Sequence, residues 1–81
     1  MDKSIYTREY ALVLRLLKEA REEAGLTQTQ LANKLKKSQS FVTKIECGDR
    51  RIDIVQLRTL CRLYGTTLSA FVDRFEKELA R

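Results

Sequence analysis

A short stretch in the middle of the chain places polar side chains between apolar ones, and its polar members are Gln39, Ser40, Thr43 and Lys44. Helical spacing puts Val42 and Ile45 on an inward face and this polar set on the outward one. Gln pairs well with adenine N6 and N7, Lys with guanine O6 and N7, and Ser with several bases. The chemistry that this face suits is hydrogen bonding to the base edges of duplex DNA.

Positive charge gathers around the same stretch. The chain of 81 residues has a net charge of +5, and residues 27–52, with six bases and two acids, hold +4 of it. Such a cluster favours a polyanionic partner, because each phosphate contact releases bound counterions. Four of these bases flank the polar face, and they are Lys36, Lys37, Arg50 and Arg51.

Phe41, at the edge of the polar face, has two interpretations. It can lie against a thymine methyl group or against a deoxyribose, and the second contact is the one that would place it at the DNA backbone. It can instead pack into the core beside the preceding helix. The sequence leaves both open.

Several classes of chemistry are excluded by residues that the sequence lacks. Without His there is no Ser-His or Cys-His pair and no His-containing zinc site. The two cysteines, Cys47 and Cys61, form no CxxC pair. We therefore expect no enzyme activity, no metal and no cofactor. The longest apolar run, Ala11–Leu14, is too short to span a membrane, and reduced thiols without a secretory signal favour a cytoplasmic, nucleoid-associated protein.

Five helices joined by tight turns must position these residues. Apolar residues recur at helical spacing over about 7–24, 27–35, 39–46, 54–64 and 67–80. Each of the three glycines, Gly25, Gly48 and Gly65, ends one such pattern. No segment alternates with the period of two that a half-buried strand requires. The sequence predicts one all-α domain over residues 1–81, in which residues 2–6 either extend the first helix or form a short arm.

Start signals and inward faces define these helices further. Thr27 with Gln30 fits a capping box, Asp53 with Gln56 three residues later is the start signal of the fourth helix, and Ser38 is a good N-cap. The inward face predicted for the first helix is Tyr10, Val13, Leu14, Leu17, Ala20 or Arg21, and Ala24. That predicted for the fourth is Ile54, Leu57, Leu60, Cys61 and Tyr64.

The second and third helices are each about eight residues long, and only three or four residues join them. Helices so short and so closely joined cross steeply, which is the helix-turn-helix geometry, here over about 27–46. In that geometry the second helix of the pair enters the major groove while the first crosses the backbone.

The chain resembles the Xre/Cro-type, lambda-repressor-like DNA-binding domains in a two-part pattern. The first part is Thr27-Gln28-x-x-Leu31-Ala32, and the second is Ser38-x-Ser40-x-Val42-x-Lys44-Ile45-Glu46-x-Gly48, followed by Arg50-Arg51. The resemblance covers about residues 10–72. It implies a compact five-helix domain, found in bacteria or phages, that binds operator DNA, usually as a dimer, and regulates transcription.

Residue roles follow from the same resemblance. Gln28 would bind a phosphate; Gln39, Ser40 and Lys44 would face bases, with Thr43 beside them; and amides around residues 47–49 would grip the backbone together with Arg50 and Arg51. Arg21 would form a structural ion pair with Glu46. The residues themselves agree on this pair, because a partly buried acid needs a partner.

The chain departs from the family pattern at two places. Lys36 and Lys37 stand where the family usually has Gly and a small apolar residue. Lys at this position is strained if the backbone is left-handed, but it adds cations at the edge of the DNA face. Cys47 is unusual before the glycine, and is either a chance surface residue or an oxidation sensor.

The last helix carries an apolar stripe longer than a domain cap requires, formed by Leu68, Phe71, Val72, Phe75 and Leu79. We expect it to form a homodimer interface, so that two copies read the half-sites of a (pseudo)palindromic operator. Its end can alternatively fold back on Ile5, Tyr6 or Tyr10. Three further functions remain open: an antitoxin that binds a protein toxin and autoregulates its operon, an activator that touches RNA polymerase, and a purely protein-binding module.

Overall fold

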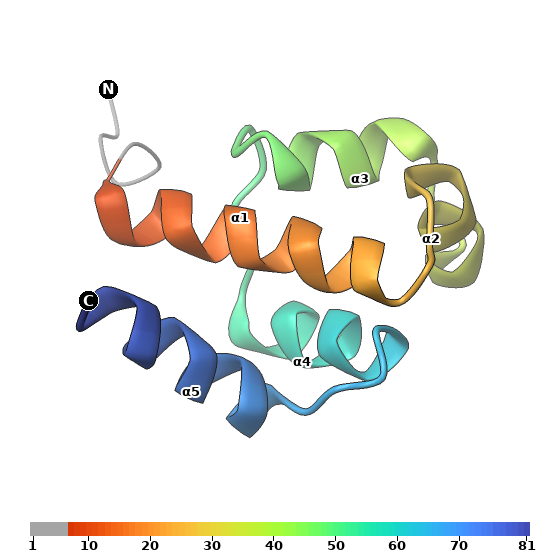
Figure 1. The fold of residues 1–81 in the computed structure, drawn as a ribbon. Coiled ribbons are helices and arrows are strands. Elements are labelled where there is room, and N and C mark those ends of the chain that lie inside the picture. Colours follow the sequence, from red (N-terminus) through yellow and green to blue (C-terminus); the bar gives the residue numbers. More distant parts are fainter. Residues whose placement is uncertain (1–6) are drawn as a thin grey trace.

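The computed structural model describes residues 7–81 and consists, over that range, of five α-helices without a strand. They are α1 (Arg8–Glu23), α2 (Gln28–Leu35), α3 (Gln39–Glu46), α4 (Ile54–Leu63) and α5 (Leu68–Leu79). α1 lies between α3 on one side and α4 and α5 on the other, with α2 at one end (Figure 1). The predicted all-α class and five helices are confirmed. The arm or helix extension expected at 2–6 lies outside the described residues.

Side-chain caps begin these helices. The five cap residues, each of which accepts the amide of the residue three positions later, are Thr7, Thr27, Ser38, Asp53 and Thr67. Thr27 with Gln30 forms a complete capping box, as predicted, and the predicted start signal at Asp53 proves to be a complete capping box with Gln56. These local bonds satisfy amide groups that a helix leaves without partners, so the sequence fixes where α2, α3 and α4 begin.

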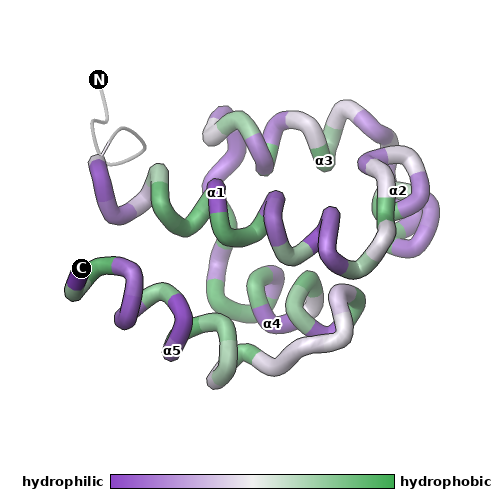
Figure 2. Tube along the Cα trace, viewed as in Figure 1, coloured by the Kyte–Doolittle hydropathy of each residue, from purple (hydrophilic) through white to green (hydrophobic). Residues whose placement is uncertain are grey.

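The core joins all five helices, and its most deeply buried side chains are Leu16, Leu17, Leu31, Val42 and Cys61. Along the chain, hydrophilic residues dominate the outer turns of α2 and alternate with hydrophobic ones in α3 (Figure 2). Burial of apolar surface stabilises such a fold by about 25 cal/mol for each Å². Within residues 7–81 no helix is long and apolar enough to cross a membrane.

Two residues predicted on inward faces are exposed. Ile54 is 67% exposed because it is the first residue of α4, where the helix has not yet reached its packing partners. Ala24 is the C-cap of α1 and is exposed for the corresponding reason at the other end. Leu16, which the sequence analysis did not place on the inward face, is 1% exposed. Helical spacing therefore locates the buried stripe correctly only where a neighbouring helix covers it.

α5 turns most of its apolar stripe toward the core of its own chain. Phe71 is 4% exposed because α5 packs this ring inward against the other helices, which leaves it little surface for the dimer interface expected of it. Phe75 packs against the same core. Val72, at 42% exposed, is the large apolar side chain of α5 that remains open to solvent.

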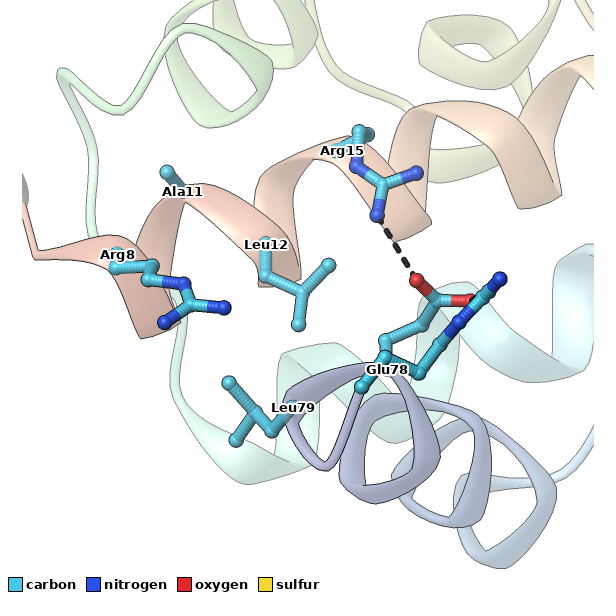
Figure 3. Close-up of a pocket in the computed structure, with 7 residues that line it drawn as sticks. Arg8, Ala11, Leu12, Arg15, Glu78 and Leu79 are labelled. Atoms are coloured by element: carbon cyan, nitrogen blue, oxygen red, sulfur yellow. Dashed lines mark hydrogen bonds and ion pairs between the residues drawn. The ribbon is translucent and has the colours of Figure 1, made fainter.

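A cavity of about 400 Å³ separates the start of α1 from the end of α5, and its lining includes Leu12 and Leu79. Both side chains point into the space between the two helices, and Arg15 donates to Glu78 across it at 3.3 Å (Figure 3). Leu79 therefore faces α1 of its own chain. Exposed ion pairs of this kind contribute little to stability, because water and salt screen their charges.

Candidate nucleic-acid interface

The turn between α2 and α3 sets the angle at which α3 leaves the body of the protein. Lys36 ends α2 in the left-handed conformation, with φ 58° and ψ 43°. The amide of Lys37 then donates to the carbonyl of Ala32 at 2.9 Å and closes the helix end. Lys36 thus takes the conformation that Gly25, Gly48 and Gly65 take at the other helix ends. The fold accepts this strain, and the turn places Lys36 and Lys37 on the surface.

A buried ion pair ties α3 to α1. Arg21 Nε donates to Glu46 Oε2 at 2.6 Å, and its Nη2 donates to Oε1 at 3.1 Å, with both side chains 8% exposed. Arg21 Nη1 also donates to the carbonyl of Leu26 at 2.7 Å. The hydrogen bond to Glu46 raises the pKa of Arg21 against the opposing effect of burial. Because every charged atom of the pair has a partner, the pair can hold the end of α3 rigidly.

The network continues into α2 through Gln28. Its Nε2 donates to Glu46 Oε1 at 2.9 Å, and its Oε1 accepts from Thr43 Oγ1 at 2.9 Å. The amide that we expected to bind a phosphate is therefore engaged within the fold, with one N–H left for a phosphate. Gln28 also orients Thr43, which lies on the outward face of α3.

The outward face of α3 is open to solvent. The polar residues predicted to meet bases, all of them exposed, are Gln39, Ser40, Thr43 and Lys44. Behind them Val42 is 1% and Ile45 is 4% exposed, which fixes the rotation of the helix about its axis. The side of α3 that carries the hydrogen-bonding groups is consequently the side that a ligand can reach.

Cations and aromatic rings border this face. Lys36, Lys37, Arg50 and Arg51 are exposed, and Phe41 is half-buried beside them. Lys37 Nζ lies 5.3 Å and Arg50 Cζ lies 4.7 Å from the centroid of the Phe41 ring. These separations fall within the range of cation–π attraction.

Two further contacts at this face were also not predicted from the sequence. Thr29 Oγ1 donates to Gln39 Oε1 at 3.2 Å, which leaves the amide nitrogen of Gln39 available to a base. Arg51 Cζ lies 5.0 Å from the centroid of the Tyr10 ring. Both contacts join different elements of the fold, and no short-range spacing in the sequence signals them.

Comparison with known proteins agrees with this geometry. The profile of a helix-turn-helix domain family matches residues 13–71. Among solved structures, an XRE-family like protein from Pseudomonas syringae pv. tomato str. DC3000 is 41% identical, with a TM-score of 0.83. The match covers 94% of this chain and 93% of that one. No curated protein matches the chain.

Proposed function

Because the chain belongs to the Xre family of helix-turn-helix DNA-binding proteins, we propose that it is a transcriptional regulator that reads a specific duplex sequence through α3. The observation that carries this proposal is the outward face of α3, where Gln39, Ser40, Thr43 and Lys44 are exposed over a buried Val42 and Ile45. Side chains of these types match the major-groove edges of bases. Proteins of this family bind DNA and typically catalyse no reaction.

Specific binding would combine two kinds of contact. Lys44 and Gln39 would discriminate between bases, and a good bidentate pair is worth about 1–3 kcal/mol against a wrong base. The cations at the border of the face, with the free N–H of Gln28, would bind phosphates and set the register of α3 in the groove. Affinity would then fall steeply with salt, because phosphate contacts release counterions.

A salt titration of duplex DNA binding tests the proposal. Arg50→Ala should weaken binding to every duplex alike and reduce the slope of log K against log salt by about one, since one phosphate contact is lost. Lys77→Ala is the matched control, because Lys77 is an exposed base on α5, on the opposite side of α1 from α3 (Figure 1). Equal effects of the two substitutions, or no duplex binding at all, would contradict the proposal.

We also propose that the protein binds as a homodimer to a (pseudo)palindromic operator. One α3 reads only a few base pairs, and two copies gain specificity by reading half-sites about 34 Å apart. The exposure of Val72 supports the outer face of α5 as the contact between copies. Leu68 lies one turn earlier on α5 and is half-buried, so the contact is narrower than the stripe read from the sequence.

A further inference from the structure

The ring of Phe41 gathers two cations that come from opposite ends of α3. Lys37 belongs to the turn before the helix, and Arg50 to the loop after it. Their charged atoms lie 5.3 Å and 4.7 Å from the same ring centroid. One aromatic side chain therefore connects two segments that the sequence separates by a whole helix.

The two cations lie near each other without a carboxylate to neutralise them. Their separation is at most the sum of the two ring distances, which is close to the screening length of about 10 Å at 0.1 M salt. No ion pair among residues 7–81 includes Lys37 or Arg50. Their mutual repulsion is opposed by the negative charge on the faces of the ring, and a nearby anion would reduce it.

The Phe41 ring lies partly within the surface of the protein. It is half-buried and lines a shallow cavity of about 150 Å³, together with Leu35, Ile45 and Leu60. The Phe41 amide donates to Oγ of Ser38, the cap of α3. The ring, which has fewer rotatable bonds than Lys or Arg, thus offers a surface on which these flexible side chains can settle, and each of them otherwise loses rotamer freedom when it binds.

We propose that Phe41 is a positioning residue that holds Lys37 and Arg50 together as one clamp for the phosphate backbone. This inference rests on the proposed DNA binding. It differs from both interpretations of Phe41 that the sequence allowed, because the ring acts through the two cations rather than by touching DNA or by filling the core. The clamp makes the contributions of the two cations depend on the ring.

The test replaces the Phe41 ring by pentafluorophenylalanine, which keeps the shape of the ring and reverses its attraction for cations. Fluorescence anisotropy measures binding of the protein to a 20-base-pair duplex at low salt. The same replacement is made in the Lys37→Ala/Arg50→Ala protein. In the otherwise unsubstituted protein we expect the fluorinated ring to weaken binding about tenfold, because the Lys37 and Arg50 side chains lose their preorganisation. In the Lys37→Ala/Arg50→Ala protein we expect the fluorinated ring to leave binding unchanged. Phe41→Tyr, which keeps a cation-binding ring, should bind as the unsubstituted protein does.

Three other results of this experiment would contradict the proposed clamp, and each points to a different reason. An equal loss in both backgrounds would mean that Phe41 supports the fold or touches DNA itself. No loss in either background would mean that the cations do not depend on the ring. If the unsubstituted protein bound no duplex, the proposed function would fail and the clamp with it, whereas normal duplex binding with either of the first two results would remove the clamp alone.

Discussion

Arg21 and Glu46 are the residues on which the position of α3 most depends. Their side chains are 8% exposed, and Glu46 accepts from Arg21 twice and from Gln28 once. Replacing such a pair by apolar groups can be neutral, but removing one partner leaves the other charge buried and unpaired. The pair thus affects both the stability of the fold and the geometry of the outward face of α3, because Gln28 hydrogen-bonds both Glu46 and Thr43.

Glu46→Ala should lower the free energy of unfolding by about 3–5 kcal/mol, since it strands the Arg21 guanidinium in the protein. Urea unfolding followed by circular dichroism measures this. Glu76→Ala is the control, because Glu76 is exposed on α5 and such substitutions usually change stability by less than about 0.5 kcal/mol. Similar stabilities for the two variants would show that the buried pair does not hold α3.

The buried phenol of Tyr64 gives stability a dependence on high pH. Burial, reinforced by the charge of Glu46, raises its pKa above the ordinary value of 10.0. The unfolded chain therefore loses this proton first, the folded chain binds more protons above about pH 10, and the free energy of unfolding falls as pH rises. Burial raises the pKa of the Cys61 thiol from its ordinary value of 9.0 and acts in the same direction from about pH 9.

We expect the free energy of unfolding to decline between about pH 9 and pH 11, by up to about 1.4 kcal/mol per pH unit for each group. Tyr64→Phe should make the decline shallower, because only Cys61 then contributes in this way. Urea unfolding of both proteins at several pH values measures the slopes. Parallel slopes would contradict the assignment to Tyr64.

At the scale of elements, a feature can be predicted from the sequence when the residues that cause it lie close together along the chain. The capping boxes that begin at Thr27 and Asp53 were predictable because each involves residues three positions apart. Ile54 was placed wrongly on an inward face, because the burial of a side chain depends on which helix lies beside it. The ring contacts of Phe41 join two loops, and a single sequence holds no signal for such a juxtaposition.

At the end of α2, the backbone conformation does not suit the residue that adopts it. Lys36 adopts φ 58°, a conformation that costs an L-residue other than glycine roughly 1–2 kcal/mol. Lys36→Gly should therefore be about 1 kcal/mol more stable than Lys36→Ala, while both variants lose the same cation and bind duplex DNA equally. Thermal unfolding together with anisotropy separates these effects. Equal stability of the two variants would mean that the turn relaxes when the side chain is changed.

For the molecule as a whole, α5 serves chiefly to complete the core. Phe71 and Phe75 pack inward, and Arg74 reaches Glu19 at 3.0 Å and Glu23 at 3.3 Å on α1. Little of its apolar stripe is left for a second copy of the chain. A dimer interface formed through α5 would therefore be small, and one charge introduced into it would weaken the dimer. Among residues 7–81, the large apolar side chains with the greatest exposed fraction lie on α4, where Ile54 is 67% and Val55 is 71% exposed.

Val72→Asp should weaken the proposed dimer by at least tenfold, as a charge enters the centre of a small apolar contact. Val55→Asp is the matched control on α4 and should leave the association unchanged. Sedimentation equilibrium measures both. If Val55→Asp alone separated the copies, the interface would lie on α4 and not on α5.

Selection of bound duplexes from a random pool tests the central claim that α3 reads base sequence. The unsubstituted protein should enrich one half-site motif, repeated at a spacing of about 34 Å. Lys44→Ala should enrich the same motif with the preference relaxed at one position of each half-site, because one bidentate contact worth about 1–3 kcal/mol is lost. Enrichment of no motif, or an identical motif of undiminished strength from the Lys44→Ala protein, would contradict the claim.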